Sequence, residues 1–98
     1  MKAPENPVPA VQVVQERQFR VAYKKLHPHQ KSAVNQAIRD LVENPLAGKE
    51  KAGDLRGIFV HKFSCAGTEY LLAYLWDPQT RVLLALGVHE NFYRDLKR

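Results

Sequence analysis

A histidine and a tyrosine near the C-terminus are the residues whose types and spacing most directly suggest chemistry. The chain ends in GVHENFYRDLKR (87–98), where His89 and Tyr93 are four positions apart. If this segment is helical, the two side chains lie one turn apart on one face. Histidine is the natural acid or base near neutral pH, and tyrosine can stack on a nucleobase or assist proton transfer. The pair could therefore take part in cleavage of a phosphodiester.

Cleavage of RNA without a metal needs positive charge as well as an acid and a base. One group removes the 2′-hydroxyl proton, another protonates the departing 5′-oxygen, and cations stabilise the phosphorane between them. Arg94 follows the tyrosine directly and could supply such charge. We expect Phe92 and Leu96 to dock this helix on a sheet, which would leave His89 and Tyr93 half exposed at the docking edge. The alternative is a surface helix whose histidine and tyrosine only cover the core.

A second candidate is the lysine of IFVHKF (58–63), which has the composition of a strand. Strand alternation places Lys62 on the face opposite to His61. A lysine on an otherwise apolar strand face can protect a sheet edge from aggregation. It can also point across the sheet toward the C-terminal segment, and the sequence leaves both possibilities open.

Other chemical interpretations are weaker. HPHQ (27–30) offers too few ligands for zinc, which usually takes three or four from the protein, so we expect a helix start there, no metal site and no cofactor. Cys65 is the only cysteine, and it fits a turn better than a nucleophile. Tyr70, Tyr74 and Trp76 share one strand face, where packing against helices is commoner than stacking on bases.

The elements that must position these residues can be read from hydrophobic periodicity. We expect a flexible arm over 1–10, an initial strand in VQVVQ (11–15), a helical hairpin over 16–43, strands over 58–63, 69–76 and 81–86, and a C-terminal helix. Short links between the last three strands favour an antiparallel arrangement. The fold class is therefore α+β, a helical hairpin packed on a small twisted, mainly antiparallel sheet.

Length and charge set the broad class of the protein. The chain has 98 residues, enough for one small domain, which we place at 11–98. Fifteen Lys and Arg against ten Asp and Glu give a net charge of +5. Such a surface attracts polyanions or an acidic protein, although a solubilising excess of lysine is the plainer explanation. With neither a signal peptide nor a long apolar run, we expect a cytoplasmic protein that does not enter the membrane.

Several segments in order resemble the RelE/ParE superfamily of bacterial type II toxin–antitoxin toxins. They are the helical hairpin, DLRG (54–57), a strand with a basic residue, EYLLAY (69–74), a further strand and GVHENFY (87–93). The C-terminal segment is most similar to the YafQ-like and ParE-like branches. The resemblance covers about residues 11–98 and implies a compact α+β toxin that a cognate antitoxin neutralises.

The resemblance also implies roles for individual residues. His89 matches the catalytic histidine of the YafQ-like branch, Tyr93 matches a C-terminal aromatic residue, and Lys62 matches a basic strand position of RelE. RelE has two further cations where this chain has Ser64 and Leu71. Residues that could compensate by binding RNA or phosphate are Arg56, His61, Arg81 and Arg94.

Three functions are compatible with this resemblance. RelE-like toxins cleave mRNA on the ribosome without a metal, whereas ParE-like toxins inhibit DNA gyrase without these catalytic residues. A non-toxic relic that still binds antitoxin is the third. In each case the expected partner is an acidic antitoxin, partly disordered when free, that lies across a basic groove.

Overall fold

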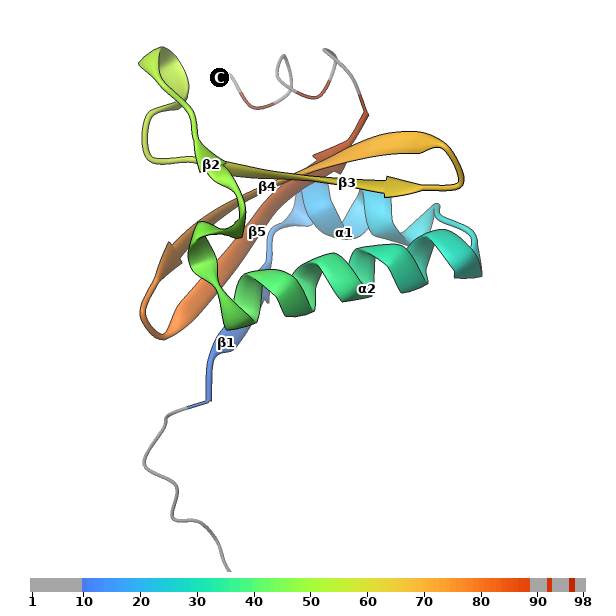
Figure 1. The fold of residues 1–98 in the computed structure, drawn as a ribbon, viewed down its shortest axis with the longest axis horizontal. Helices are drawn as coiled ribbons and strands as arrows, with labels where there is room; N and C mark the ends of the chain where they lie inside the picture. The colour runs from blue at the N-terminus through green and yellow to red at the C-terminus, as the bar shows by residue number, and fades with distance from the viewer. Residues whose placement is uncertain (1–9, 89–91, 93–95, 97–98) are drawn as a thin grey trace, which may run out of the picture.

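The computed structural model describes residues 10–88 together with Phe92 and Leu96, and it shows two helices on one side of a five-stranded sheet (Figure 1). The strands are β1 (Gln12–Gln15), β2 (Lys49–Glu50), β3 (Phe59–Cys65), β4 (Thr68–Asp77) and β5 (Thr80–Gly87). The helices are α1 (Arg17–Lys24) and α2 (Pro28–Glu43), with short 3₁₀ helices η1 (Pro45–Ala47) and η2 (Gly53–Leu55). The predicted α+β class is confirmed.

The helical hairpin begins and ends at the signals that the sequence carries. His27 is the N-cap of α2, and its backbone N–H donates to the Gln30 side chain at 2.8 Å in a capping box. Pro28 occupies the first turn, where its missing N–H costs nothing. At the other end Asn44 is extended, as the residue before a proline must be. The predicted hairpin over 16–43 is confirmed, and HPHQ is a helix start.

The sheet has the strand order β1-β5-β4-β3-β2, in which β3, β4 and β5 are antiparallel neighbours. The β3–β4 turn consists of Ala66 and Gly67, both with positive φ (51° and 83°), as a two-residue hairpin of type I′ requires. Cys65 is therefore the last residue of β3 and not part of the turn. Asp77 closes the next turn by accepting a hydrogen bond from the Gln79 N–H at 2.8 Å.

Two edge strands complete the sheet. The predicted strand in VQVVQ is β1, which runs parallel to β5. β2 was not predicted, and it pairs with β3 at only two positions, Lys49↔Val60 and Glu50↔Phe59. A two-residue strand carries no periodicity, so the sequence gives no signal for it. Within the described part of the chain, no helix is long and apolar enough to span a membrane.

The helix-facing side of the sheet holds the larger core. Its fully buried side chains are Phe19, Val34, Leu41, Leu72, Tyr74 and Leu83. Tyr70 and Trp76 pack against this cluster. The prediction that the aromatic residues of β4 belong to the core is confirmed.

The opposite side of the sheet, here called the tail face, is a smaller aliphatic surface. It consists of Val60, Leu71, Ala73 and Ala85, and Phe92 from the C-terminal segment covers it. Leu96 packs on the same cluster, and Phe92 is only 4% exposed. The prediction that Phe92 and Leu96 dock on the sheet is confirmed. The rest of the predicted C-terminal helix and the arm up to residue 9 lie outside the described residues.

Candidate functional site

Lys62 is the predicted site residue that the structure places most informatively. Its side chain is exposed and shares the tail face with Val60, two residues before it on β3. In the sheet register Lys62 pairs with Leu71, which in turn pairs with Gly87. Gly87 lies two residues before His89, so a row about 10 Å long leads from the lysine to the start of the C-terminal segment.

The structure places Lys62 both at an edge of the sheet and on the tail face. β2 pairs with β3 only at Phe59 and Val60, so Lys62 lies on an edge of the sheet. Its side chain also lies on the face that the C-terminal segment covers. His89, Tyr93 and Arg94 fall outside the described residues, so their roles stay predictions.

His61 lies on the other side of the sheet from Lys62. Its Nε2 atom is 3.8 Å from Oδ2 of Asp40 on α2, and its ring stacks on Phe63 with centroids 6.1 Å apart. The sheet therefore separates this imidazole from the tail face. This corrects the prediction that His61 contributes to the same phosphate site as Lys62.

Arg81 is a structural residue. It is 3% exposed, and its guanidinium donates to the carbonyl oxygens of Leu41 at 2.7 Å and Val42 at 3.1 Å, in the last turn of α2. It also donates to the carbonyls of Asp77 at 2.8 Å and Thr80 at 3.2 Å. Carbonyls at a helix C-terminus have no intrahelical partner, and the arginine satisfies them. This corrects the prediction that Arg81 binds phosphate, because its donors are used within the protein.

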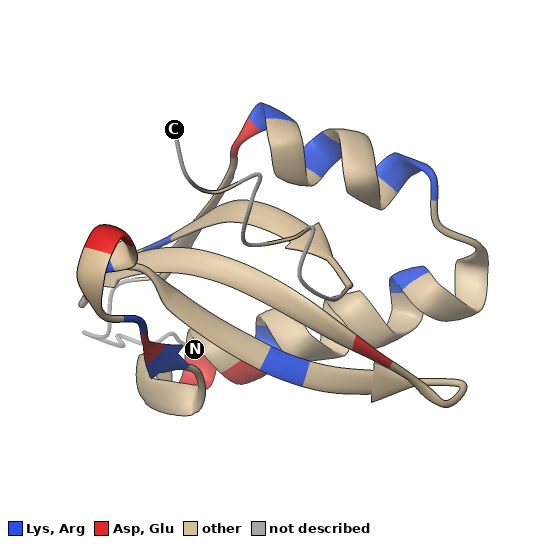
Figure 2. Ribbon diagram, turned by 90° about the horizontal axis from the view of Figure 1, so that it is seen from above, with Lys and Arg blue, Asp and Glu red and all other residues tan. Residues whose placement is uncertain are grey.

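Arg56 lies on the loop between β2 and β3, which rises on the side of the sheet away from the two helices (Figure 1). The side chain is exposed, and Glu50 stabilises the loop by accepting a hydrogen bond from the Gly57 N–H at 3.0 Å. Basic residues occur both on this loop and on β3 in the view from above (Figure 2). Arg56 thus lies on the same side of the sheet as Lys62.

A buried tyrosine anchors the segment that leads from α2 into β2. The Tyr74 hydroxyl donates to the Pro45 carbonyl at 2.6 Å and accepts from the Gly48 N–H at 2.9 Å. A Cβ at Gly48 would lie 2.8 Å from this hydroxyl oxygen and from the Val60 backbone, so only glycine fits. Burial raises the pKa of Tyr74 above its usual value, although the Gly48 hydrogen bond and Arg81 act in the opposite direction. The sequence predicted that Tyr74 packs in the core, but not that its hydroxyl forms these hydrogen bonds.

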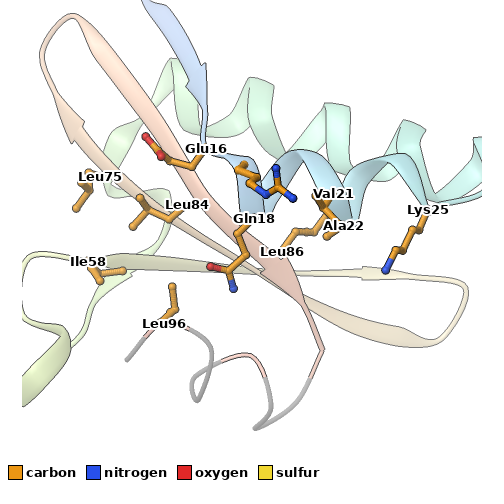
Figure 3. A pocket seen from close by; sticks show the side chains of 11 residues that line it. Glu16, Gln18, Val21, Ala22, Lys25, Ile58, Leu75, Leu84, Leu86 and Leu96 are labelled. Carbon is orange, nitrogen blue, oxygen red and sulfur yellow. The ribbon is translucent and has the colours of Figure 1, made fainter. Parts of the chain in front are cut away.

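A groove between α1 and the sheet was not predicted. Its volume is about 990 Å³, and its apolar lining includes Leu75, Leu84, Leu86 and Leu96 (Figure 3). Its polar lining residues are Glu16, Arg17 and Gln18 at the start of α1 and Lys25, the C-cap of that helix. A signal was available in the sequence, since Arg17, Arg20 and Lys24 recur at helical spacing and form a basic stripe. All three are exposed, and none forms a salt bridge in the part of the chain that the structure describes.

Comparison with known proteins identifies the family. A family model described as ParE-like toxins of type II bacterial toxin–antitoxin systems matches residues 13–97. The chain belongs to this family. A search of curated protein sequences finds no match.

Solved structures support this assignment. One chain of the RelBE2 toxin–antitoxin complex from Mycobacterium tuberculosis is 31% identical, with a TM-score of 0.66 over 82% of this chain and 99% of that one. A chain of the RelBE complex from E. coli is 18% identical, with a TM-score of 0.65 over 83% of this chain and 99% of the E. coli chain. A double mutant of E. coli RelE in the free state is 14% identical, with a TM-score of 0.69 over 90% of this chain and 93% of the RelE chain. The last two share the fold, and the RelE/ParE resemblance is confirmed.

Within this ParE-like toxin, the positions singled out by the resemblance to RelE are brought together. Lys62, Ser64 and Leu71 all lie on the tail face, with Lys62 directly opposite Leu71 in the register. Only Lys62 carries a charge, whereas Leu71 is 5% exposed and packs in the cluster that contains Phe92. Among the described residues no group of His, Cys, Asp and Glu could hold a metal ion.

Proposed function

We propose that this toxin blocks translation by cutting mRNA on the ribosome without a metal, in the cytoplasm. Lys62 would bind the scissile phosphate, His89 would act as acid or base, and Tyr93 would stack on a base or assist proton transfer. The observation that carries the proposal is the position of Lys62, exposed on the tail face and in register with Gly87. Arg56, on the same side of the sheet, and Arg94 would add to RNA binding.

The test measures mRNA cleavage in a reconstituted translation reaction with purified toxin. His89→Ala and Lys62→Met should each lower the cleavage rate by about a hundredfold, the usual effect of removing an acid–base group or a charge at a developing anion. Lys24→Met is the matched control, because Lys24 is an exposed lysine in the last turn of α1 and does not belong to the sheet. If His89→Ala cuts RNA and arrests growth like the unmodified toxin, the proposal is wrong.

The second candidate is inhibition of DNA gyrase without catalysis. It is favoured by Ser64 and Leu71, which leave the tail face with little charge for binding a phosphate. A supercoiling assay with purified gyrase separates the two functions, since a nuclease leaves supercoiling unchanged. A chain that neither cleaves RNA, inhibits gyrase nor arrests growth would be the non-toxic relic.

The proposed partner is a cognate antitoxin, since two of the three neighbours named above are chains of toxin–antitoxin complexes. The groove beside α1 suits an acidic amphipathic segment, because its lining includes four leucines and two cations, Arg17 and Lys25, against one carboxylate, Glu16. The net charge of +5 also attracts an acidic partner. Co-expression with the antitoxin should restore growth, and Arg17→Glu should weaken the complex while Arg39→Glu, on α2, should not.

A further inference from the structure

The outer edge of β1 is open. β1 is the last strand on its side of the sheet, and in the part of the chain that the structure describes it pairs only with β5. All four of its residues are exposed, with Val13 at 39% and Val14 at 42%. Native sheets usually protect such an edge with a charge, a proline or a bulge. The strand QVVQ has no charge and no proline, and its register with β5 is continuous. This edge is therefore able to pair with a further strand.

The hydrogen bonds to β5 fix which backbone groups of β1 point outward. The N–H groups of Gln12 and Glu16 each donate at 2.9 Å to a carbonyl of β5 or of the turn before it. In a parallel pair alternate residues face the same neighbour, so Val13 and Gln15 direct their N–H and C=O groups to the outer side. The Gln15 carbonyl agrees with this, because it accepts a hydrogen bond from Nη1 of Arg20 at 2.8 Å. A carbonyl oxygen has two lone pairs, so it can accept a second hydrogen bond.

The backbone of β1 is complementary to itself when two copies pair antiparallel about a two-fold axis at Val14. In that register Val13 of each copy lies opposite Gln15 of the other. Each outward N–H then meets an outward C=O, so the outward groups of both strands have partners. Moving the axis to Val13 would instead place Gln15 opposite Val11, which lies before β1. The axis at Val14 is thus the one that uses the whole strand.

The side chains on the tail-face side of β1 fit the same register. Val14 pairs with Val82 and Val82 with Leu75, a row of aliphatic side chains across three strands in which Leu75 is 39% exposed. The axis at Val14 joins this row to its copy, so apolar side chains meet at the centre of the interface. On either side of the axis Gln12 lies opposite Glu16, where the amide can donate to the carboxylate. Two charges of the same sign are therefore not opposed along β1.

We propose that two copies of this toxin associate through their β1 edges into a continuous ten-stranded sheet. A second copy is the occupant because β1 is uncharged and self-complementary, so it does not select the acidic partner that the net charge of +5 attracts. Each copy has one such edge, so pairing closes the assembly at a dimer. The interface is small, and we expect a dissociation constant of about 10–100 μM. β5 and β4 separate β1 from β3, which puts Lys62 about 14 Å from the interface and leaves it accessible.

Exchanging the charge at Val14 tests the two-fold register, because this residue faces its own copy. Sedimentation equilibrium of the purified chain should show a monomer–dimer equilibrium. Val14→Lys and Val14→Glu should each weaken the dimer by about tenfold or more, since like charges then face each other, and an equimolar mixture of the two should associate again. Val21→Lys is the matched control and should form dimers, because Val21 is equally exposed, at 42%, but lies on α1. The proposal is overturned by a monomeric unmodified chain, by undiminished dimers of Val14→Lys, or by a mixture that stays monomeric.

Hydrogen exchange on the unmodified chain gives a second test without any substitution. The amides of Val13 and Gln15 should exchange severalfold more slowly when the toxin concentration is raised well above the dissociation constant. The amides of Gln12 and Glu16, which are hydrogen bonded within the chain, serve as the internal reference. Exchange at Val13 that is independent of concentration contradicts the proposal. Slow exchange only in the presence of antitoxin contradicts it too, since the occupant would then be the antitoxin. Neither measurement uses RNA, so failure of the dimer proposal is distinct from failure of the nuclease proposal.

Discussion

The two sides of the sheet are built from the same strands but have different chemistry. The helix-facing side packs aromatic rings, with Phe59 5.7 Å from Tyr74 and 5.8 Å from Trp76 between ring centroids. Two of its buried polar groups, the Tyr74 hydroxyl and the Arg81 guanidinium, are hydrogen bonded to the backbone. The tail face has smaller side chains, a single exposed lysine on β3, and one phenylalanine as its largest buried group.

This difference shows how so short a chain divides its roles. A domain of this size has one substantial core, and here that core lies under the helices. The tail face is thereby left to the C-terminal segment and to Lys62, where residues can change without loss of the fold. The same division explains why the RelE-like cations can be missing from the tail face of a chain that keeps the RelE/ParE fold.

The largest expected effect comes from truncating the central phenylalanine on each side. Phe19 is fully buried in the helix-side core, so Phe19→Ala should lower the free energy of unfolding by about 3–5 kcal/mol. Phe92→Ala should cost about 1–3 kcal/mol, because the C-terminal segment can detach while the sheet stays folded. Urea unfolding measures both. Equal losses would mean that the two sides form one cooperative core.

Removal of the guanidinium of Arg81 tests whether the helix-facing side depends on this buried charge. Arg81→Met should destabilise the fold by about 3 kcal/mol, since carbonyls of α2 and of the β4–β5 turn lose their donor inside the protein. Arg56→Met is the control on an exposed arginine and should change stability by less than about 0.5 kcal/mol. If both variants change the free energy of unfolding by a similar small amount, Arg81 is not needed for stability.

Tyr74→Phe should have a smaller effect, about 1–2 kcal/mol, because it removes the hydroxyl between Pro45 and Gly48. Tyr23→Phe is the control, since Tyr23 donates to Asn35 at an exposed site. Because the folded-state pKa of Tyr74 is raised, the stabilisation is fully present below pH 10 and falls as pH rises through the higher folded pKa. Urea unfolding of both proteins from pH 8 to 11 should show the difference narrowing above pH 10.

How far the sequence predicts this structure depends on the length of each pattern. The helical hairpin, the three long strands and the docking of Phe92 and Leu96 follow from periodicities that extend over two turns or five residues. β2 could not be predicted in this way, because a strand of two residues shows no periodicity. The groove beside α1 arises from the distance between elements, which no local pattern encodes.

The candidate site was less predictable than the fold, and the charged residues show why. Strand alternation correctly separated His61 from Lys62, but nothing in the sequence indicates that Asp40 lies beside the histidine. Arg81 looked like an exposed cation at a strand end. Its burial depends on α2 ending above it, a contact between residues 40 positions apart. Contacts of this kind become visible only when the elements are assembled.

The last prediction concerns the charge that the tail face lacks. Ser64 is exposed and two residues beyond Lys62 on the same face, so Ser64→Lys adds a second cation beside the first. If the toxin cleaves RNA at this face, the cleavage rate should rise about threefold to tenfold, less than a preorganised donor provides. Unfolding free energy should change by less than about 0.5 kcal/mol. Ser64→Glu is the matched variant and should lower the rate. Equal rates for the two variants would mean that no phosphate passes near β3, and that the difference between the two sides of the sheet has another purpose, such as binding gyrase or the antitoxin.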